Sequence, residues 1–171
     1  MGLDTDPLGI KLFRPCGMQY PDGKQFGEWG PMWGYHFADG KWVEGKKDGV
    51  GQHGGYDIRC PLGTVLHAPA RGKVLESGWQ NPLNEKQGYG RRLLIEFEDA
   101  VDAGGGRLVR PLLTLGHFSE IWVPKGAMVM REDDLGLSGE TGNTSGAHLH
   151  AQLEIPGPYP RTPLQFEWVT V

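Results

Sequence analysis

Apolar and polar residues alternate along residues 147–155, near the C-terminal end of the chain. Alanine, leucine and isoleucine occupy one parity, and histidine, glutamine and glutamate occupy the other. This period of two is typical of a β-strand that turns one face toward a core. His148 and His150 then point the same way with Cα atoms about 6.5–7 Å apart, whereas on a helix they would lie about 200° apart. The pattern predicts a strand that presents both imidazoles to one spot.

Further apolar runs occur upstream, and segments rich in glycine, proline, asparagine and aspartate separate them. They predict strands over 64–70, 72–79, 91–98, 107–118, 134–139 and 148–155. No window combines a helical period with capping residues, and residues 163–168 are expected to form one short turn at most. We therefore expect a mainly β protein, with a compact antiparallel β-sheet domain whose long loops form a groove over the sheet.

Residues 1–48 differ from the rest of the chain because they show no clear strand register. They are rich in glycine and contain three of the six tryptophans, Trp29, Trp33 and Trp42. We expect an irregular aromatic extension over 1–48 that packs on the core, followed by the main domain over 49–171. Because aromatic residues in loops often form contact surfaces, the alternative is that part of this extension walls a substrate groove.

Composition and charge exclude several classes of protein. The formal net charge of −4 is spread over mixed acidic and basic residues, so nucleic acid is not an expected partner. No apolar run reaches 18 residues, which predicts no membrane span. Cys16 and Cys60 are too few for a disulfide framework, and two free thiols are favoured over one bridge. Residues 1–10 lack the basic and apolar regions of a secretory leader.

A second group of polar residues lies in "GQHGGYDIRC", where His53 and Asp57 are four residues apart. Gly54 and Gly55 between them make a helix improbable. A bent loop that enters a strand is the better interpretation, and it brings the imidazole and the carboxylate together. His117, in "TLGHFSEI", is a third candidate at the end of an apolar strand.

Two histidines and one carboxylate form a ligand set that holds Zn²⁺ and leaves a fourth position for water. The ion lowers the pKa of that water to about 7. The remaining histidines are suited to proton transfer and to stabilising a developing oxyanion, because the pKa of imidazole lies near neutrality. The spacing alone leaves open which residues are ligands and which are catalysts.

In these motifs the chain resembles the lysostaphin-type peptidoglycan endopeptidases, over roughly residues 49–155. The matching motifs are H-x-x-x-D at 53–57 and H-x-H at 148–150, which follows the glycine-rich segment "SGETGNTSGA". Members of this family are zinc enzymes that cut peptide bonds in the cross-links of bacterial cell walls. The resemblance implies one Zn²⁺ per chain, held by His53, Asp57 and His150.

The resemblance also implies the catalytic roles and the partner. His148 is the non-ligating histidine of the H-x-H pair and acts as general base or transition-state stabiliser, and His117 is the second catalytic histidine. The implied substrate is a bacterial peptidoglycan peptide, either a stem peptide or a cross-bridge, and a monomer is favoured. The implied site of action is the cell wall, and a phage-encoded protein made in the host cytoplasm is one expected source.

Two alternatives from other classes remain at this point. One is a non-catalytic relative that binds wall peptides or regulates another hydrolase, although such proteins usually lose ligands. The other is a non-haem iron oxygenase, which also uses two histidines and a carboxylate. Outside the candidate site, His67 is expected to be structural, and His36 is expected to be structural or a groove contact. Gln152 and Glu154 share the histidine face and are expected to be solvated at the groove edge rather than to support a ligand.

Overall fold

The computed structural model describes residues 10–103, 105–156 and 162–169. Within these ranges every regular element is a strand, and no helix is long and apolar enough to cross a bilayer. The strands are β1 (Lys11–Phe13), β2 (Trp29–Gly30), β3 (Tyr35–Ala38), β4 (Lys41–Glu44), β5 (Gly51–Gln52), β6 (Tyr56–Ile58), β7 (Val65–His67), β8 (Gly72–Trp79), β9 (Arg91–Phe97), β10 (Val101–Asp102), β11 (Leu108–Val109), β12 (Leu112–Ile121), β13 (Met128–Val129), β14 (Asp134–Ser138), β15 (Leu149–Ile155), β16 (Thr162–Leu164) and β17 (Glu167–Val169).

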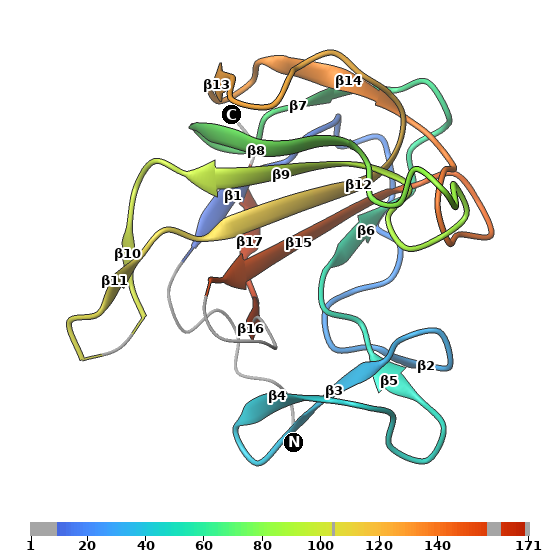
Figure 1. The fold of residues 1–171 in the computed structure, drawn as a ribbon, viewed down its shortest axis with the longest axis vertical. Helices are drawn as coiled ribbons and strands as arrows, with labels where there is room; N and C mark the ends of the chain where they lie inside the picture. The colour runs from blue at the N-terminus through green and yellow to red at the C-terminus, as the bar shows by residue number, and fades with distance from the viewer. Residues whose placement is uncertain (1–9, 104, 157–161, 170–171) are drawn as a thin grey trace.

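The main structure is a nine-stranded sheet with antiparallel pairing throughout (Figure 1). Its main path runs β13-β8-β9-β12-β14-β7, and β15 joins it by pairing with β12, β6 and β16. The small pairs β2–β5 and β3–β4 lie to one side of this sheet (Figure 1). The prediction of a mainly β, antiparallel fold is confirmed.

Strand β12 is the centre of this arrangement because it has three partners. One edge pairs with β9. The other edge pairs with β15 from Leu112 to Gly116 and with β14 from Phe118 to Ile121. The strand therefore changes partner at His117.

The core packs against the apolar face of β15 and of its neighbouring strands. Leu149, Ala151 and Leu153 are completely buried, which confirms the face that the alternation predicts. Leu93, Ile95, Leu113 and Leu115, on the adjoining strands β9 and β12, are equally buried in the same cluster. Apolar burial on this scale is the dominant favourable contribution to folding, so it fixes the direction in which the polar parity of β15 points.

The prediction of a single turn over residues 163–168 was wrong. Two strands lie there, with β16 pairing with β15 and β17 pairing with β1 in parallel. The expected strand over 107–118 is also different, because it divides into β11 and a longer β12 that continues to Ile121.

The described part of the N-terminal extension, residues 10–48, contains four short strands, where the sequence predicts none. Two of them have partners remote in the chain, β17 for β1 and β5 for β2, while β3 and β4 pair with each other. Strands of two to four residues are too short to show a period. Ile10 and Leu12 are buried in the main core, while the division of the chain at residue 48 stays a prediction. Cys16 and Cys60 are buried free thiols.

Candidate metal centre

Three neighbouring strands place the centre of the site in one row across the sheet. His150 of β15 is the direct pairing partner of Asp57 on β6 and of Gly116 on β12. Side chains of directly opposed residues lie about 4.5–5.5 Å apart at Cβ. The backbone ladder therefore brings Asp57 and His150 together although they are 93 residues apart in the sequence.

His53 reaches the same point from the loop between β5 and β6. Its backbone N–H donates to the Glu28 carbonyl, and its own carbonyl accepts from Gly27. Gly55 is needed for close approach, because a Cβ there would lie 2.4 Å from the Ala151 carbonyl oxygen and 2.8 Å from Cε1 of His150. The glycine thus lets the loop lie directly on β15, which brings His53 beside His150.

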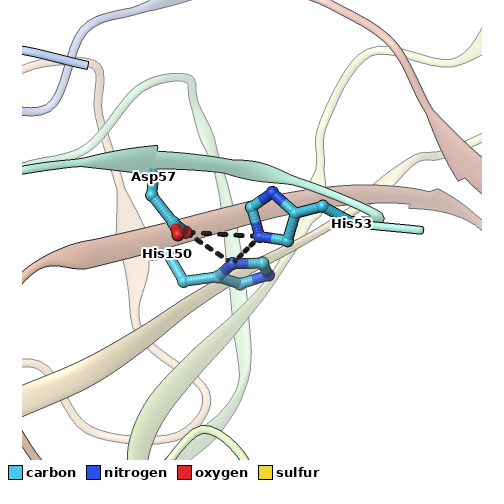
Figure 2. A group of neighbouring side chains, drawn as sticks. All are labelled: His53, Asp57 and His150. Carbon is cyan, nitrogen blue, oxygen red and sulfur yellow. Dashed lines mark hydrogen bonds and ion pairs between the residues drawn. The ribbon is translucent and has the colours of Figure 1, made fainter. Parts of the chain in front are cut away.

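The three side chains converge as the sequence predicts (Figure 2). His150 Nδ1 lies 2.9 Å from Asp57 Oδ1 and 3.0 Å from His53 Nε2. The third separation, from His53 Nε2 to Asp57 Oδ1, is 3.4 Å. Ligands bound at about 2.0–2.2 Å in a tetrahedral site lie roughly 3.3 Å from one another. The spacing of the three atoms therefore suits a small divalent ion.

The hydrogen bonds of the other ring nitrogens test this fit further. His53 Nδ1 donates to the Gln25 carbonyl at 3.2 Å, and His150 Nε2 donates to Gln152 Oε1 at 3.0 Å. In these neutral tautomers the two nitrogens that face each other across 3.0 Å both carry lone pairs. A cation between them satisfies both lone pairs, and an outward N–H bonded to a carbonyl is the usual arrangement of metal-ligating histidines.

Asp57 is suited to remain ionised in this site. Burial by itself raises the pKa of the carboxyl. In the metal-free protein His150 and His53, when their rings are protonated, donate hydrogen bonds to Asp57 and add positive charge, which outweighs burial and holds the pKa of the carboxyl well below its usual range. A carboxylate that stays ionised at neutral pH is available as an oxygen ligand.

His117 lies beside this cluster on an unusual backbone. Its φ is 67°, in the left-handed region, and it occupies the bulge where the pairing of β12 with β9 shifts register. Bulges near sites of chemistry commonly re-aim a side chain. Here the ring Nδ1 donates to the Thr141 carbonyl at 2.6 Å, which leaves Nε2 available.

Burial, followed by the charge of His148, lowers the pKa of His117 to about 4. The ring is therefore neutral at physiological pH, with a lone pair at Nε2. The nearest ring is that of His148, with centroids 4.6 Å apart.

His148 immediately precedes β15 and stands between His117 and Asp57. Its Nδ1 donates to the Gly146 carbonyl at 2.9 Å and lies 3.1 Å from Thr144 Oγ1. Its Nε2 lies 3.7 Å from Asp57 Oδ2. The structure therefore brings all five predicted site residues together.

A cavity of about 580 Å³ opens over these side chains. Besides His53, Asp57, His117, His148 and His150, it is lined by Gly23, Lys24, Met32, Trp33, Arg59, Cys60, Pro61 and the segment 143–147. Trp33 packs on His53 with ring centroids 4.7 Å apart. A second cavity of about 610 Å³ shares Met32 and Trp33 with the first, so Trp33 lines both cavities.

The sequence analysis placed Gln152 incorrectly. It is not simply solvated, because its Oε1 accepts hydrogen bonds from His150 Nε2 at 3.0 Å and from the Tyr89 hydroxyl at 3.2 Å. Tyr89 also stacks on His150, with centroids 5.3 Å apart. Glu154 is likewise buried rather than solvated. The only signal for Gln152 in the sequence is its shared parity with His150.

Thr141 and Thr144 were also missed, because they act through a carbonyl and a hydroxyl in a loop without periodicity. The other histidines lie elsewhere, as expected. His67 pairs with Asp134 (Nδ1–Oδ1 2.9 Å), and His36 Nδ1 contacts the Gly45 carbonyl at 2.8 Å.

The fold is thus an antiparallel β-sheet that carries a buried His–Asp–His cluster and two further histidines beside it. Residues 51–160 match the family model for Peptidase family M23. The chain belongs to this family.

Relatives and solved structures agree with this assignment. The chain is 31% identical over 108 residues to the peptidoglycan DD-endopeptidase ShyA of Vibrio cholerae serotype O1, covering 63% of this chain and 21% of the relative. It is 27% identical over 131 residues to lysostaphin of Staphylococcus simulans, covering 70% and 24%. The catalytic domain of that lysostaphin, crystallized in the absence of phosphate, is 27% identical with a TM-score of 0.58 and coverages of 81% and 83%. The chain thus corresponds to about a quarter or less of the length of these two relatives.

Proposed function

We propose that this protein is a zinc-dependent endopeptidase that hydrolyses peptide bonds in bacterial peptidoglycan, in stem peptides or cross-bridges. The observation that carries the proposal is the convergence of His53, Asp57 and His150 at ligand spacing beneath an open cavity. Membership of the family and relatives named as peptidoglycan endopeptidases support the choice of substrate. This substrate implies action at the cell wall.

In this proposal His53 Nε2, Asp57 Oδ1 and His150 Nδ1 hold one Zn²⁺. When bound, zinc lowers the pKa of a coordinated water to about 7 and polarises the scissile carbonyl. The outward hydrogen bonds to Gln25 and Gln152 keep both rings in the tautomer that directs a lone pair inward.

The two remaining histidines handle protons and charge. His117 is neutral at the working pH, and its free Nε2 can accept a proton from the attacking water. His148, held by the Gly146 carbonyl, can act as the general base, or as an imidazolium that donates to the developing oxyanion. Proton transfer by such groups contributes about 10²–10⁴-fold in rate.

The test is an assay of free amino groups released from purified peptidoglycan between pH 6 and 9, with zinc-loaded and with chelator-treated protein. We expect release with zinc, loss with the chelator, and recovery on adding zinc back. Wall binding without any release by zinc-loaded protein would instead favour the non-catalytic alternative. Metal analysis of the purified protein separates zinc from the iron of an oxygenase.

A further inference from the structure

The cavity over the metal centre has a one-sided charge. Lys24 and Arg59 both line it, and Asp57 is the only acidic residue among the described residues that do so. Two cationic side chains against one carboxylate give the cavity a net positive charge. A bound divalent ion would add to that charge.

Arg59 belongs to the same face as Asp57. The two residues are separated by Ile58, which is completely buried, and residues two apart on an extended chain point the same way, about 6.5–7 Å apart at Cα. Arg59 thus follows the metal ligand along the floor of the cavity.

The neighbouring segment confirms this orientation and leaves room for the side chain. Residues 21–24 run antiparallel beside β6, with Gly23 N–H bonded to the Asp57 carbonyl and Arg59 N–H bonded to the Pro21 carbonyl, both at 2.8 Å. A Cβ at Gly23 would lie 3.0 Å from Asp57 Cβ and 3.4 Å from Arg59 Cγ. Both side chains therefore leave the backbone on the same side of this segment.

The guanidinium of Arg59 has no acidic partner within the described part of the chain. Other arginines there, such as Arg14, Arg71 and Arg92, form ion pairs with carboxylates. Arg59 is exposed and forms neither an ion pair nor a side-chain hydrogen bond among these residues. Its five N–H donors in a planar fork match the geometry of a carboxylate.

We infer that Arg59, supported by Lys24, is a specificity-determining subsite that binds a substrate carboxylate one or two residues from the scissile bond. This inference rests on the proposed function and narrows its substrate class. Acidic residues and free C-termini of stem peptides supply such carboxylates, whereas the interior of an uncharged oligoglycine bridge supplies none. The structure therefore assigns this protein to anionic stem peptides rather than to glycine bridges.

The test uses zinc-loaded full-length protein and peptides that differ in one group. The first pair carries a side-chain carboxylate or its carboxamide beside the scissile bond, the second carries a free or amidated C-terminus, and an oligoglycine peptide completes the set. We expect wild type to prefer one of the carboxylates. Arg59→Gln should raise KM for that peptide about tenfold, the size of a charge-assisted hydrogen bond, with kcat unchanged.

Two further variants distinguish a specific contact between Arg59 and the carboxylate from an effect of the net charge of the protein. Arg59→Lys should retain part of the preference, because it keeps the charge and loses the fork. Lys73→Gln, an equal charge change at an exposed position of β8 outside the cavity, should leave every KM unchanged. If Arg59→Gln abolishes the preference in the first peptide pair, the bound carboxylate is that of a side chain. If it abolishes the preference in the second pair, the bound carboxylate is that of a free C-terminus.

A direct measurement of peptide affinity tests the inference independently of catalytic turnover. Titration calorimetry of the same peptides with zinc-loaded His148→Ala measures affinity while cleavage is slow, and Arg59→Gln in that background should weaken only the carboxylate peptide. Equal preference in wild type and Arg59→Gln would overturn the inference while leaving the peptidase intact. Absence of cleavage of every peptide and of peptidoglycan, with carboxylate binding still dependent on Arg59, would overturn the proposed function alone.

Discussion

The metal cluster and the pair His117 and His148 use the same residue type but are positioned in different ways. Asp57 and His150 are direct partners in the β-ladder, so strand register sets their separation. The rings of His117 and His148 are instead held by carbonyls of Thr141 and Gly146, in the loop between β14 and β15. Strand register therefore fixes where Asp57 and His150 lie, while the loop between β14 and β15 determines how the rings of His117 and His148 are aimed.

The largest effect should follow from removing a ligand. His150→Ala leaves two ligands and should abolish zinc binding together with activity, a loss greater than the roughly 10²–10⁴-fold typical of an acid–base group. Zinc content after dialysis and kcat/KM on a peptidoglycan peptide measure both quantities. Retention of stoichiometric zinc would contradict the assignment of His150 to the cluster.

Replacing His117 or His148 should lower the catalytic rate without removing the zinc. His148→Ala and His117→Asn should keep most zinc and lose about 10²–10⁴-fold in kcat. Asparagine suits position 117 because it tolerates the left-handed backbone there. If His148→Ala instead loses zinc, the division between ligands and proton-transfer groups is wrong.

Acid should destabilise the metal-free protein through His117. Its folded-state pKa of about 4 lies below the ordinary value of 6.5, so between these values the unfolded chain binds the extra proton. Stability is then lost as pH falls from 6.5 to 4, by about 3 kcal/mol from this group.

Urea unfolding of chelator-treated protein at several pH values measures this loss. His117→Asn should show a shallower decline over the same interval, because it has no proton to bind. An identical decline in wild type and variant would show that the ring is not held neutral by burial.

A smaller effect should follow from loss of the support behind a ligand. Gln152→Ala removes the acceptor for His150 Nε2 and should weaken zinc affinity about 10- to 100-fold. Competition with a chromogenic chelator measures the affinity. The control is Gln19→Ala, at an exposed position away from the cavity, and it should bind zinc like wild type.

Part of the fold and of the site followed from local patterns. The alternation around Leu149 and Leu153 predicted a strand and its buried face, and both are confirmed. The strands β16 and β17 and those of residues 10–48 did not, because each has only two to four residues, and β1, β2 and β17 also depend on partners remote in the chain. The role of Gln152 was missed for a related reason, since its hydrogen-bond partner Tyr89 is 63 residues away.

By itself the sequence determined which chemical groups are available and on which parity of a strand they lie. Period-two burial needs only local alternation, so His148 and His150 had to share a face whatever the topology. Only the tertiary structure decided that Asp57 lies opposite His150, that His117 is turned by a bulge, and that Arg59 faces the same cavity without an acidic partner among the described residues. These outcomes depend on strand register and long-range packing, which join segments far apart along the chain and leave no local pattern in it.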